Sequence, residues 1–336
     1  QIVSLFIWKN FLIYLLTAAI FGLIQKIFIS AYFNKLYPFL KDKKSEKLTR
    51  KEKKTLFNKV KALTIHKIGD VSVHQTDNII VSAFVSTKTV GLLSNYNLII
   101  NTVSNCINVL FNSVTGSLGN MVATETKEYQ YKVFKQYRFI GFWFYGFTAI
   151  ALAVLMTPFI TLWIGDKMIV DAFTINLIVL DYYMIGQRIC LNNIKSAAGV
   201  FEPDKYVALL QAVVNLVTSI FFVQLIGLPG VYVGTIIQGT LSSVLKPVLS
   251  YKILFNKSSK YYFKDSIRYG VAVIFAYIVC SVIKEKLLID LTVLNFIIMI
   301  AIVIIIPNLL FVLLFHKDSE FKYLTSIAKG MLKKRM

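Results

Sequence analysis

The sequence has few of the residues that enzymes and metal sites use for their chemistry. Its 336 residues include only three cysteines and three histidines, and these are scattered instead of being paired at metal or redox spacing. It contains no nucleotide-binding loop, nucleophile elbow or zinc signature. We expect Cys106, Cys190 and Cys280, which lie in apolar stretches, to be small buried side chains. The sequence therefore predicts no enzyme, no cofactor and no metal site.

Acidic residues and polar surface are also scarce. Asp and Glu number 17 against 37 Lys and Arg, which gives a net charge of +20, while 56% of the residues are hydrophobic and 14% are aromatic. A soluble domain of this length would need more polar surface than this composition supplies. The composition indicates an all-α, polytopic membrane protein. Its positive charge belongs at a membrane surface, and we expect no nucleic-acid partner.

A membrane-spanning helix needs about twenty largely apolar residues. Nine windows of this kind are found, at 11–33, 68–87, 91–116, 139–163, 174–198, 206–226, 229–251, 269–284 and 291–315. The 68–87 window is polar for a span, and the 269–284 window is short. The chain opens at Gln1 inside an apolar run, so we expect a fragment without its natural amino terminus.

Basic residues mark one side of these windows. Of the 37 Lys and Arg residues, 28 lie in alternate connections, chiefly the long basic segment 35–67, which we expect to be partly helical. The positive-inside rule places these connections in the cytoplasm. The opposite connections, 88–90, 164–173, 227–230 and 285–290, are all short. They leave no room for a catalytic domain outside the membrane, which argues against a membrane polymerase or ligase.

Two windows, 68–87 and 91–116, carry rows of polar residues at helical spacing, which we call the first and second stripes. Residues three or four apart share one helix face, and unpaired polar groups in hydrocarbon are costly. The stripes therefore predict a hydrated cavity. In the first stripe Asp77, with His74 and Asn78, is a candidate for binding a coupling cation or relaying a proton, or else a structural partner of a basic residue. The second stripe supplies candidate cavity-lining amides at Asn97, Asn101, Asn105 and Asn108.

The window 174–198 carries charges on one face, at Asp181, Arg188 and Lys195, together with Asn192. Lys195 lies near the end of the window and can snorkel to the surface. Arg188 lies at mid-depth, so it must be paired, hydrated or directed into a cavity. We predict that Asp181, Arg188 and Asn192 contact substrate or line a cavity, and Lys26 in the first window is a further candidate. Gly230 and Gly234 form a GxxxG pattern that predicts close helix packing.

Two long stretches resemble one transporter family. HKIGDVSVHQTDNIIVSAFVSTKTVGLLSNYNLI, residues 66–100, and AAGVFEPDKYVALLQAVVNLVTSIFFVQLIGLPGVYVGTII, residues 197–237, resemble segments of the Wzx-type bacterial polysaccharide flippases of the multidrug/oligosaccharidyl-lipid/polysaccharide exporter superfamily. The resemblance covers about residues 60–255 and is one of pattern over long segments.

The resemblance implies two six-helix bundles, as in related multidrug exporters, with two extra helices at the carboxyl end. On this pattern residues 1–34 hold the end of the first bundle, which is mostly absent from the chain. Residues 35–67 are a basic cytoplasmic linker, residues 68–251 are the second bundle, and residues 252–336 are two additional helices with a basic tail.

The function that the resemblance implies is the movement of undecaprenyl-pyrophosphate-linked oligosaccharides, such as O-antigen or capsule repeat units, across the bacterial cytoplasmic membrane by alternating access. Arg188 and Lys26 are then candidates to bind the pyrophosphate. Sodium ions or protons are possible coupling ions, and membrane lipids and other polysaccharide-assembly proteins are expected partners. The alternatives are a cation-coupled multidrug exporter of the same superfamily and, third, a membrane enzyme that transfers or polymerises sugars.

Overall fold

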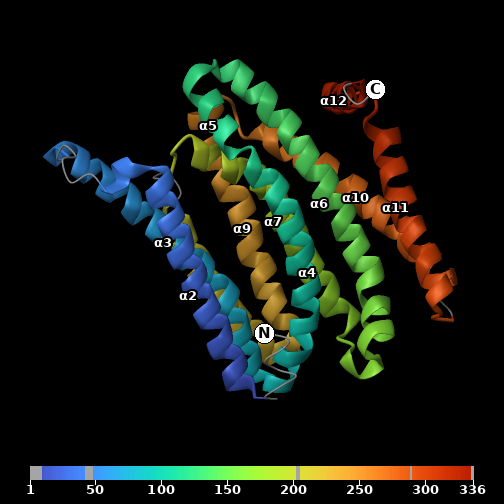
Figure 1. Ribbon diagram of the computed structural model, residues 1–336. Helices are drawn as coiled ribbons and strands as arrows, with labels where there is room; N and C mark the ends of the chain where they lie inside the picture. The colour runs from blue at the N-terminus through green and yellow to red at the C-terminus, as the bar shows by residue number, and fades with distance from the viewer. Residues whose placement is uncertain (1–9, 42–47, 202–204, 288–289, 334–336) are drawn as a thin grey trace. The chain divides into compact units, whose positions relative to one another are not determined.

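The computed structural model describes residues 10–41, 48–201, 205–287 and 290–333, and within these ranges the chain is helical without any strand. The elements, in chain order (Figure 1), are α2 Phe11–Leu36, the 3-10 helix η1 Pro38–Lys41, α3 Arg50–Phe84, α4 Thr87–Ser113, α5 Thr115–Thr124, α6 Lys127–Ile164, the 3-10 helix η2 Asp166–Met168, α7 Ala172–Ala197, α8 Lys205–Ile226, α9 Leu228–Phe255, α10 Lys260–Leu287, α11 Val293–Phe315 and α12 Ser319–Lys333. The protein is an all-α polytopic bundle.

Local sequence explains where several helices begin. Ser86 caps α4 by accepting a hydrogen bond from Thr89 N at 3.0 Å, and Asp171 caps α7 by accepting one from Thr174 N at 2.8 Å. Gly227, with φ of 67°, and Pro229 mark the sharp turn between α8 and α9. Ser86 and Asp171 therefore fix where α4 and α7 begin.

Each of the nine predicted windows falls on a helix, but the helices differ in polarity. Within the part of the chain that the structure describes, seven segments are long and apolar enough to cross a membrane: α2, α4 with α5, α6, α8, α9, α10 and α11. Helices α3 and α7 are more polar, because α3 begins with basic residues and α7 carries Asp181, Arg188 and Lys195. The chain is a multi-pass membrane protein whose two polar helices need partners inside the protein.

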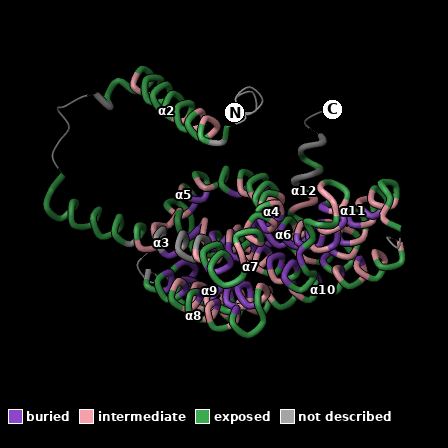
Figure 2. Tube along the Cα trace, turned by 90° about the horizontal axis from the view of Figure 1, so that it is seen from below, coloured by how far each residue is buried: buried purple, intermediate pink, exposed green. Residues whose placement is uncertain are grey.

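The chain divides into two units, one ending at Leu56 and one beginning at Phe57. In the first unit, α2 is an apolar helix that leads into η1. The second unit contains the rest of α3 and all later helices. There, α8 packs closely against α9, α7 packs between α6 and α9, and α10 and α11 pack on α6 (Figures 1 and 2).

Close packing of α8 on α9 confirms the prediction from the GxxxG pattern. A Cβ added at Gly230 would lie 2.2 Å from the Phe222 carbonyl oxygen, and one at Gly234 would lie 2.5 Å from Ser219 N. Neither position has room for a side chain, since real Cβ contacts are longer than this. The two helices therefore pack backbone to backbone.

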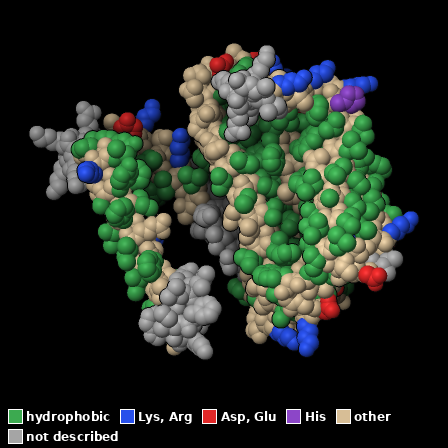
Figure 3. All heavy atoms as spheres, turned by 45° about the vertical axis from the view of Figure 1, so that its right-hand side comes forward, with side chains coloured by type: hydrophobic (Ala, Val, Ile, Leu, Met, Phe, Trp, Pro, Cys, Tyr) green, Lys and Arg blue, Asp and Glu red, His purple; other side chains and the backbone are tan. Residues whose placement is uncertain are grey.

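Aromatic side chains fill the interface of α6 with α10 and α11. Phe142 stacks on Tyr269 with ring centroids 4.2 Å apart, and Phe311 and Phe315 pack on the same ring of Phe142. Outside this core, apolar side chains cover the visible face of the helices, while Lys, Arg, Asp and Glu gather at their ends (Figure 3). An apolar exterior of this kind suits a hydrocarbon environment.

One prediction about cysteine is wrong. Cys190 and Cys280 are buried as expected, but Cys106 is exposed. Cys106 lies on α4 next to the exposed Asn105 and is not among the buried residues of that helix. An apolar stretch in a membrane protein can face lipid as well as core, so hydropathy alone does not predict burial.

Candidate functional site

Polar side chains from α3, α4, α7 and α9 meet in one cavity of about 180 Å³, which we call the central pocket. Six of the residues that line it were candidates from the sequence. They are Asp77, Asn78, Asn97, Asn101, Asn108 and Asp181. The other lining residues include Ser104, Thr235, three tyrosines and three isoleucines. The two striped windows and the charged window thus share one polar site.

Helix geometry decides which asparagines of α4 reach the central pocket. Successive residues of an α-helix are rotated by about 100°. Asn101 and Asn108 therefore lie within roughly 40° of the direction of Asn97, whereas Asn105 is turned away by about 80°. Asn105 correspondingly does not line the pocket.

Asp77 is held by hydrogen bonds from two other helices. Its Oδ2 accepts a hydrogen bond from Thr235 Oγ1 at 2.9 Å, and its Oδ1 accepts one from Asn215 Nδ2 at 3.3 Å. Asn215 Nδ2 also lies 3.2 Å from Thr235 Oγ1. Because Asn215 is on α8 and Thr235 is on α9, this one carboxyl joins three helices.

Asn215 and Thr235 were not among the residues predicted from the sequence. Both lie on helices that are largely apolar. A weak signal did exist, because Gln211, Asn215 and Ser219 recur every four residues on α8 and all three are buried. A buried polar face of this kind needs partners from neighbouring helices, which here include Asp77 and Thr235.

Three tyrosines give the central pocket an aromatic wall. Tyr145 donates a hydrogen bond to Asn108 Oδ1 at 2.7 Å, and Tyr182 lies with its hydroxyl 2.7 Å from Thr148 Oγ1. The Tyr145 and Tyr182 rings are 5.4 Å apart, and Tyr232 lines the pocket from α9. These side chains place aromatic rings and hydrogen-bonding hydroxyls around the central pocket.

No Lys or Arg stands among the described residues that line the central pocket. Arg188 is buried in the α7–α9 interface, where its Nη1 donates hydrogen bonds to Gly239 O and to Ser243 Oγ, both at 2.7 Å. A Cβ added at Gly239 would lie 3.5 Å from Asp181 Oδ1 and 3.8 Å from Arg188 Nη1. Arg188 therefore binds α9 behind the wall of the pocket, near Asp181.

The remaining candidates lie elsewhere. Asn192 is half-buried and outside the lining of the central pocket. Lys26 is exposed on α2 and belongs to the first unit. The side chain of His74 lies outside the described residues. Their predicted roles stay predictions.

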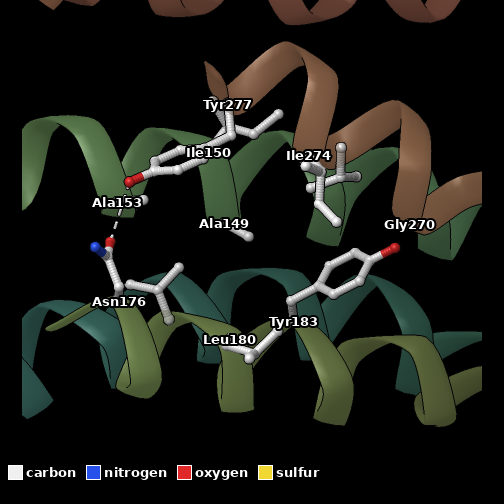
Figure 4. A pocket seen from close by; sticks show the side chains of 11 residues that line it. Ala149, Ile150, Ala153, Asn176, Leu180, Tyr183, Gly270, Ile274 and Tyr277 are labelled. Atoms are coloured by element: carbon white, nitrogen blue, oxygen red, sulfur yellow. Dashed lines mark hydrogen bonds between the residues drawn. The ribbon is translucent and has the colours of Figure 1, made fainter. Parts of the chain in front are cut away.

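A second cavity, of about 280 Å³, lies between α6, α7 and α10 and differs in chemistry. Its walls are formed mainly by apolar side chains such as Ile150, Leu180 and Ile274 (Figure 4). At one end Tyr277 donates a hydrogen bond to Asn176 Oδ1 at 3.3 Å, and the hydroxyl of Tyr183 is directed toward Gly270 (Figure 4). With so few polar groups, this cavity offers little to a hydrophilic ligand.

Comparison with known proteins gives one match. A family model described as polysaccharide biosynthesis protein matches residues 5–170. The matched segment includes the first of the two stretches quoted above and the central-pocket residues of α3, α4 and α6. No curated protein and no solved structure matches the chain.

Proposed function

Because a family model described as polysaccharide biosynthesis protein matches residues 5–170 of this chain, we propose that the protein moves lipid-linked oligosaccharides across the bacterial cytoplasmic membrane. The substrate would be an undecaprenyl-pyrophosphate-linked repeat unit, such as one of O-antigen or capsule. Transport would follow alternating access, in which two bundles rock around a central site. The observation that carries the proposal is the convergence of amides, carboxylates and tyrosines in the central pocket.

The chemistry of the central pocket suits sugar. Sugar hydroxyls both donate and accept hydrogen bonds, and Asn97, Asn101 and Asn78 offer both kinds of group. Tyrosine rings add amphipathic contact surface at low entropic cost. The mid-membrane depth of these groups is itself a sign of function, since polar residues there are costly.

The pyrophosphate needs a different place from the central pocket. Two carboxylates, Asp77 and Asp181, line this pocket, and they would repel a phosphate. Arg188 is engaged by α9 in this structure, so we propose that it meets the pyrophosphate only in a conformation that separates α7 from α9. Lys26 of the first unit remains a second candidate.

The proposal is tested with alanine variants of two asparagines on the same helix. Asn101→Ala removes an amide from the central pocket and should lower export of surface polysaccharide at least tenfold, the equivalent of about 1.4 kcal/mol. Asn105→Ala is the matched control, because Asn105 lies one turn away on α4 and does not line the central pocket. Immunoblots of the membrane fraction check that both variants are present. Equal export by the two variants would contradict a role for this pocket.

A second candidate function is cation-coupled export of drugs. The pair of carboxylates in the central pocket favours it, since cationic compounds need acidic partners. The measurement is efflux of a cationic dye from cells that express the full protein, alongside surface polysaccharide. Dye efflux without an effect on polysaccharide would replace our proposal with this one.

A further inference from the structure

The last described helix, α12, lies across the direction of the membrane helices. Three residues separate it from the end of α11 at Phe315. Figure 1 shows α12 nearly end-on while α11 runs down the picture, and Figure 2, turned by 90°, shows α12 from the side. Because α11 is apolar enough to span a membrane, a helix that follows it directly and runs crosswise lies at the membrane surface.

Three contacts hold the start of α12 against the bundle. Glu320 forms an ion pair with Lys135 of α6, and Phe321 stacks on Trp143 of α6 with ring centroids 5.8 Å apart. In the turn before α12, Asp318 binds Arg268 of α10 through two hydrogen bonds of 2.7 and 3.1 Å. The orientation of α12 is therefore fixed by α6 and α10.

The sequence of α12 is strongly two-sided. Its apolar residues recur at a spacing of three or four and share one side, and no other described helix separates its apolar and polar residues as sharply. They are Phe321, Leu324, Ile327, Ala328, Met331 and Leu332. A short helix with this pattern typically lies with its apolar side in the acyl region and its polar side toward water.

The exposed charge on and beside α12 is positive. Lys317, Lys322 and Lys329 are exposed, whereas the two acidic residues, Asp318 and Glu320, are both engaged in ion pairs. The sequence adds Lys333, Lys334 and Arg335, whose side chains lie outside the described residues. A basic segment at a membrane surface attracts anionic lipid headgroups.

We propose that α12 is an interfacial helix that binds the headgroups of anionic phospholipids. The occupant follows from position and charge together. The crosswise helix lies at headgroup level, and its exposed charges are cationic. The ligand is the phosphate-bearing surface of the bilayer, in contrast to the sugar that we propose for the central pocket.

The test compares hydrogen exchange of the α12 amides in two kinds of nanodisc that hold the full chain. One contains phosphatidylcholine only, and the other also contains phosphatidylglycerol. We expect slower exchange over Ser319–Lys333 with phosphatidylglycerol, and we expect added salt to remove the difference. Equal exchange in the two lipids would overturn the proposal.

Two double variants identify the groups responsible. Lys322→Gln with Lys329→Gln should reduce the phosphatidylglycerol-dependent slowing roughly fivefold per lysine, since one basic residue near an anionic surface contributes about 1 kcal/mol. Lys127→Gln with Lys132→Gln is the control, because it removes the same charge from α6 at exposed positions. A loss of slowing in the control alone, or in both pairs equally, would contradict a role for α12. The experiment measures no transport, so its result is independent of the proposed function.

Discussion

Asp77 shows how one carboxyl can serve both structure and transport. Thr235 and Asn215 hold it from two helices with neutral hydrogen bonds, while its side chain also lines the central pocket. Neutral partners leave the negative charge available for a cation or proton from the pocket. We therefore keep Asp77 as the coupling candidate and add Asn215 and Thr235 as the residues that orient it.

Replacement of Asp77 by asparagine should uncouple transport. Asn keeps the size of the side chain but removes the charge, so export should lose most of its dependence on the ion gradient while the protein stays in the membrane. The measurement is export with and without an ionophore. Asp166→Asn, at an exposed position of η2, is the control. Export that stays equally sensitive to the ionophore in Asp77→Asn would remove Asp77 from the coupling mechanism.

The glycines of the α8–α9 contact allow a prediction about stability. Gly234→Ala would place a Cβ within 2.2 Å of Ser219 Oγ and 2.5 Å of Ser219 N, so the helices must move apart. We expect a loss of about 1–3 kcal/mol, seen as a lower melting temperature in detergent. Gly270→Ala on α10 is the control, because nothing lies within 4 Å of its added Cβ. It should be neutral or slightly stabilising, since alanine favours helix. Equal melting temperatures of Gly234→Ala and Gly270→Ala would contradict this prediction, because they would show that the α8–α9 contact can shift to accept the added Cβ.

At the scale of the elements, Arg138 joins α6 to α10. It is buried, it donates hydrogen bonds to Tyr262 O at 2.9 Å and to Ser266 Oγ, and it lies over the Tyr262 ring with its Cζ 3.7 Å from the centroid. Asp265 Oδ2 is 3.5 Å away. A guanidinium can make all these contacts at once because its donors are planar and forked.

Removal of Arg138 should weaken the packing of the helix pair α10–α11 on α6. Arg138→Met leaves Tyr262 O and Asp265 without this partner, and we expect a loss of about 3 kcal/mol, measured as a lower melting temperature. Arg268→Met is the matched control. Its ion pair with Asp318 is half exposed on the arginine side, so we expect a loss below about 1 kcal/mol. A larger loss of stability in Arg268→Met than in Arg138→Met would contradict this prediction. It would show that the Arg268–Asp318 pair beside α12 contributes more than the contact of Arg138 with α10.

The attachment of α12 to α6 should depend on pH. Burial raises the pKa of Glu320, but its hydrogen bond and charge interaction with Lys135 outweigh this, and the pKa lies below the usual value for glutamate. The ionised carboxyl stabilises the attached state at pH values above the pKa that the group has in the unfolded chain. This contribution is lost as the pH falls through the lower pKa that the group has in the folded protein. Acidification below the ordinary pKa range of glutamate should therefore release α12. The fluorescence of Trp143, which stacks on Phe321, reports release. Glu320→Gln should remove this pH dependence, and a transition that persists in the variant would assign it to another group.

At the scale of the whole molecule, alternate connections carry most of the basic residues. Lys127 begins α6, and Lys257 and Lys317 lie in the connections that precede α10 and α12, whereas the opposite connections are short. In Figure 1, α5 and α12 lie at one end of the second unit, where these connections also lie. We propose that this end faces the cytoplasm, since basic loops are retained there.

Cysteine labelling tests this orientation. In a variant without the three native cysteines, Lys167→Cys should react with an impermeant maleimide in intact cells, and Lys257→Cys should react only after permeabilisation. Both positions are in connections at opposite ends of the second unit. The reverse pattern would invert the orientation and with it the proposed direction of transport.

The sequence by itself determined the class of protein and the helices. Membrane helices depend on local hydropathy and length, and polar stripes depend on the fixed rotation between residues, so both are readable from the chain. It also identified Asp77, Asn97, Asn101 and Asp181 as polar groups of one cavity. Only the tertiary structure decided that Arg188 binds α9, that Asn105 and Cys106 are exposed, and that Asn215 and Thr235 hold Asp77. These features depend on how each helix is rotated against its neighbours, which is set by contacts between residues far apart in the chain.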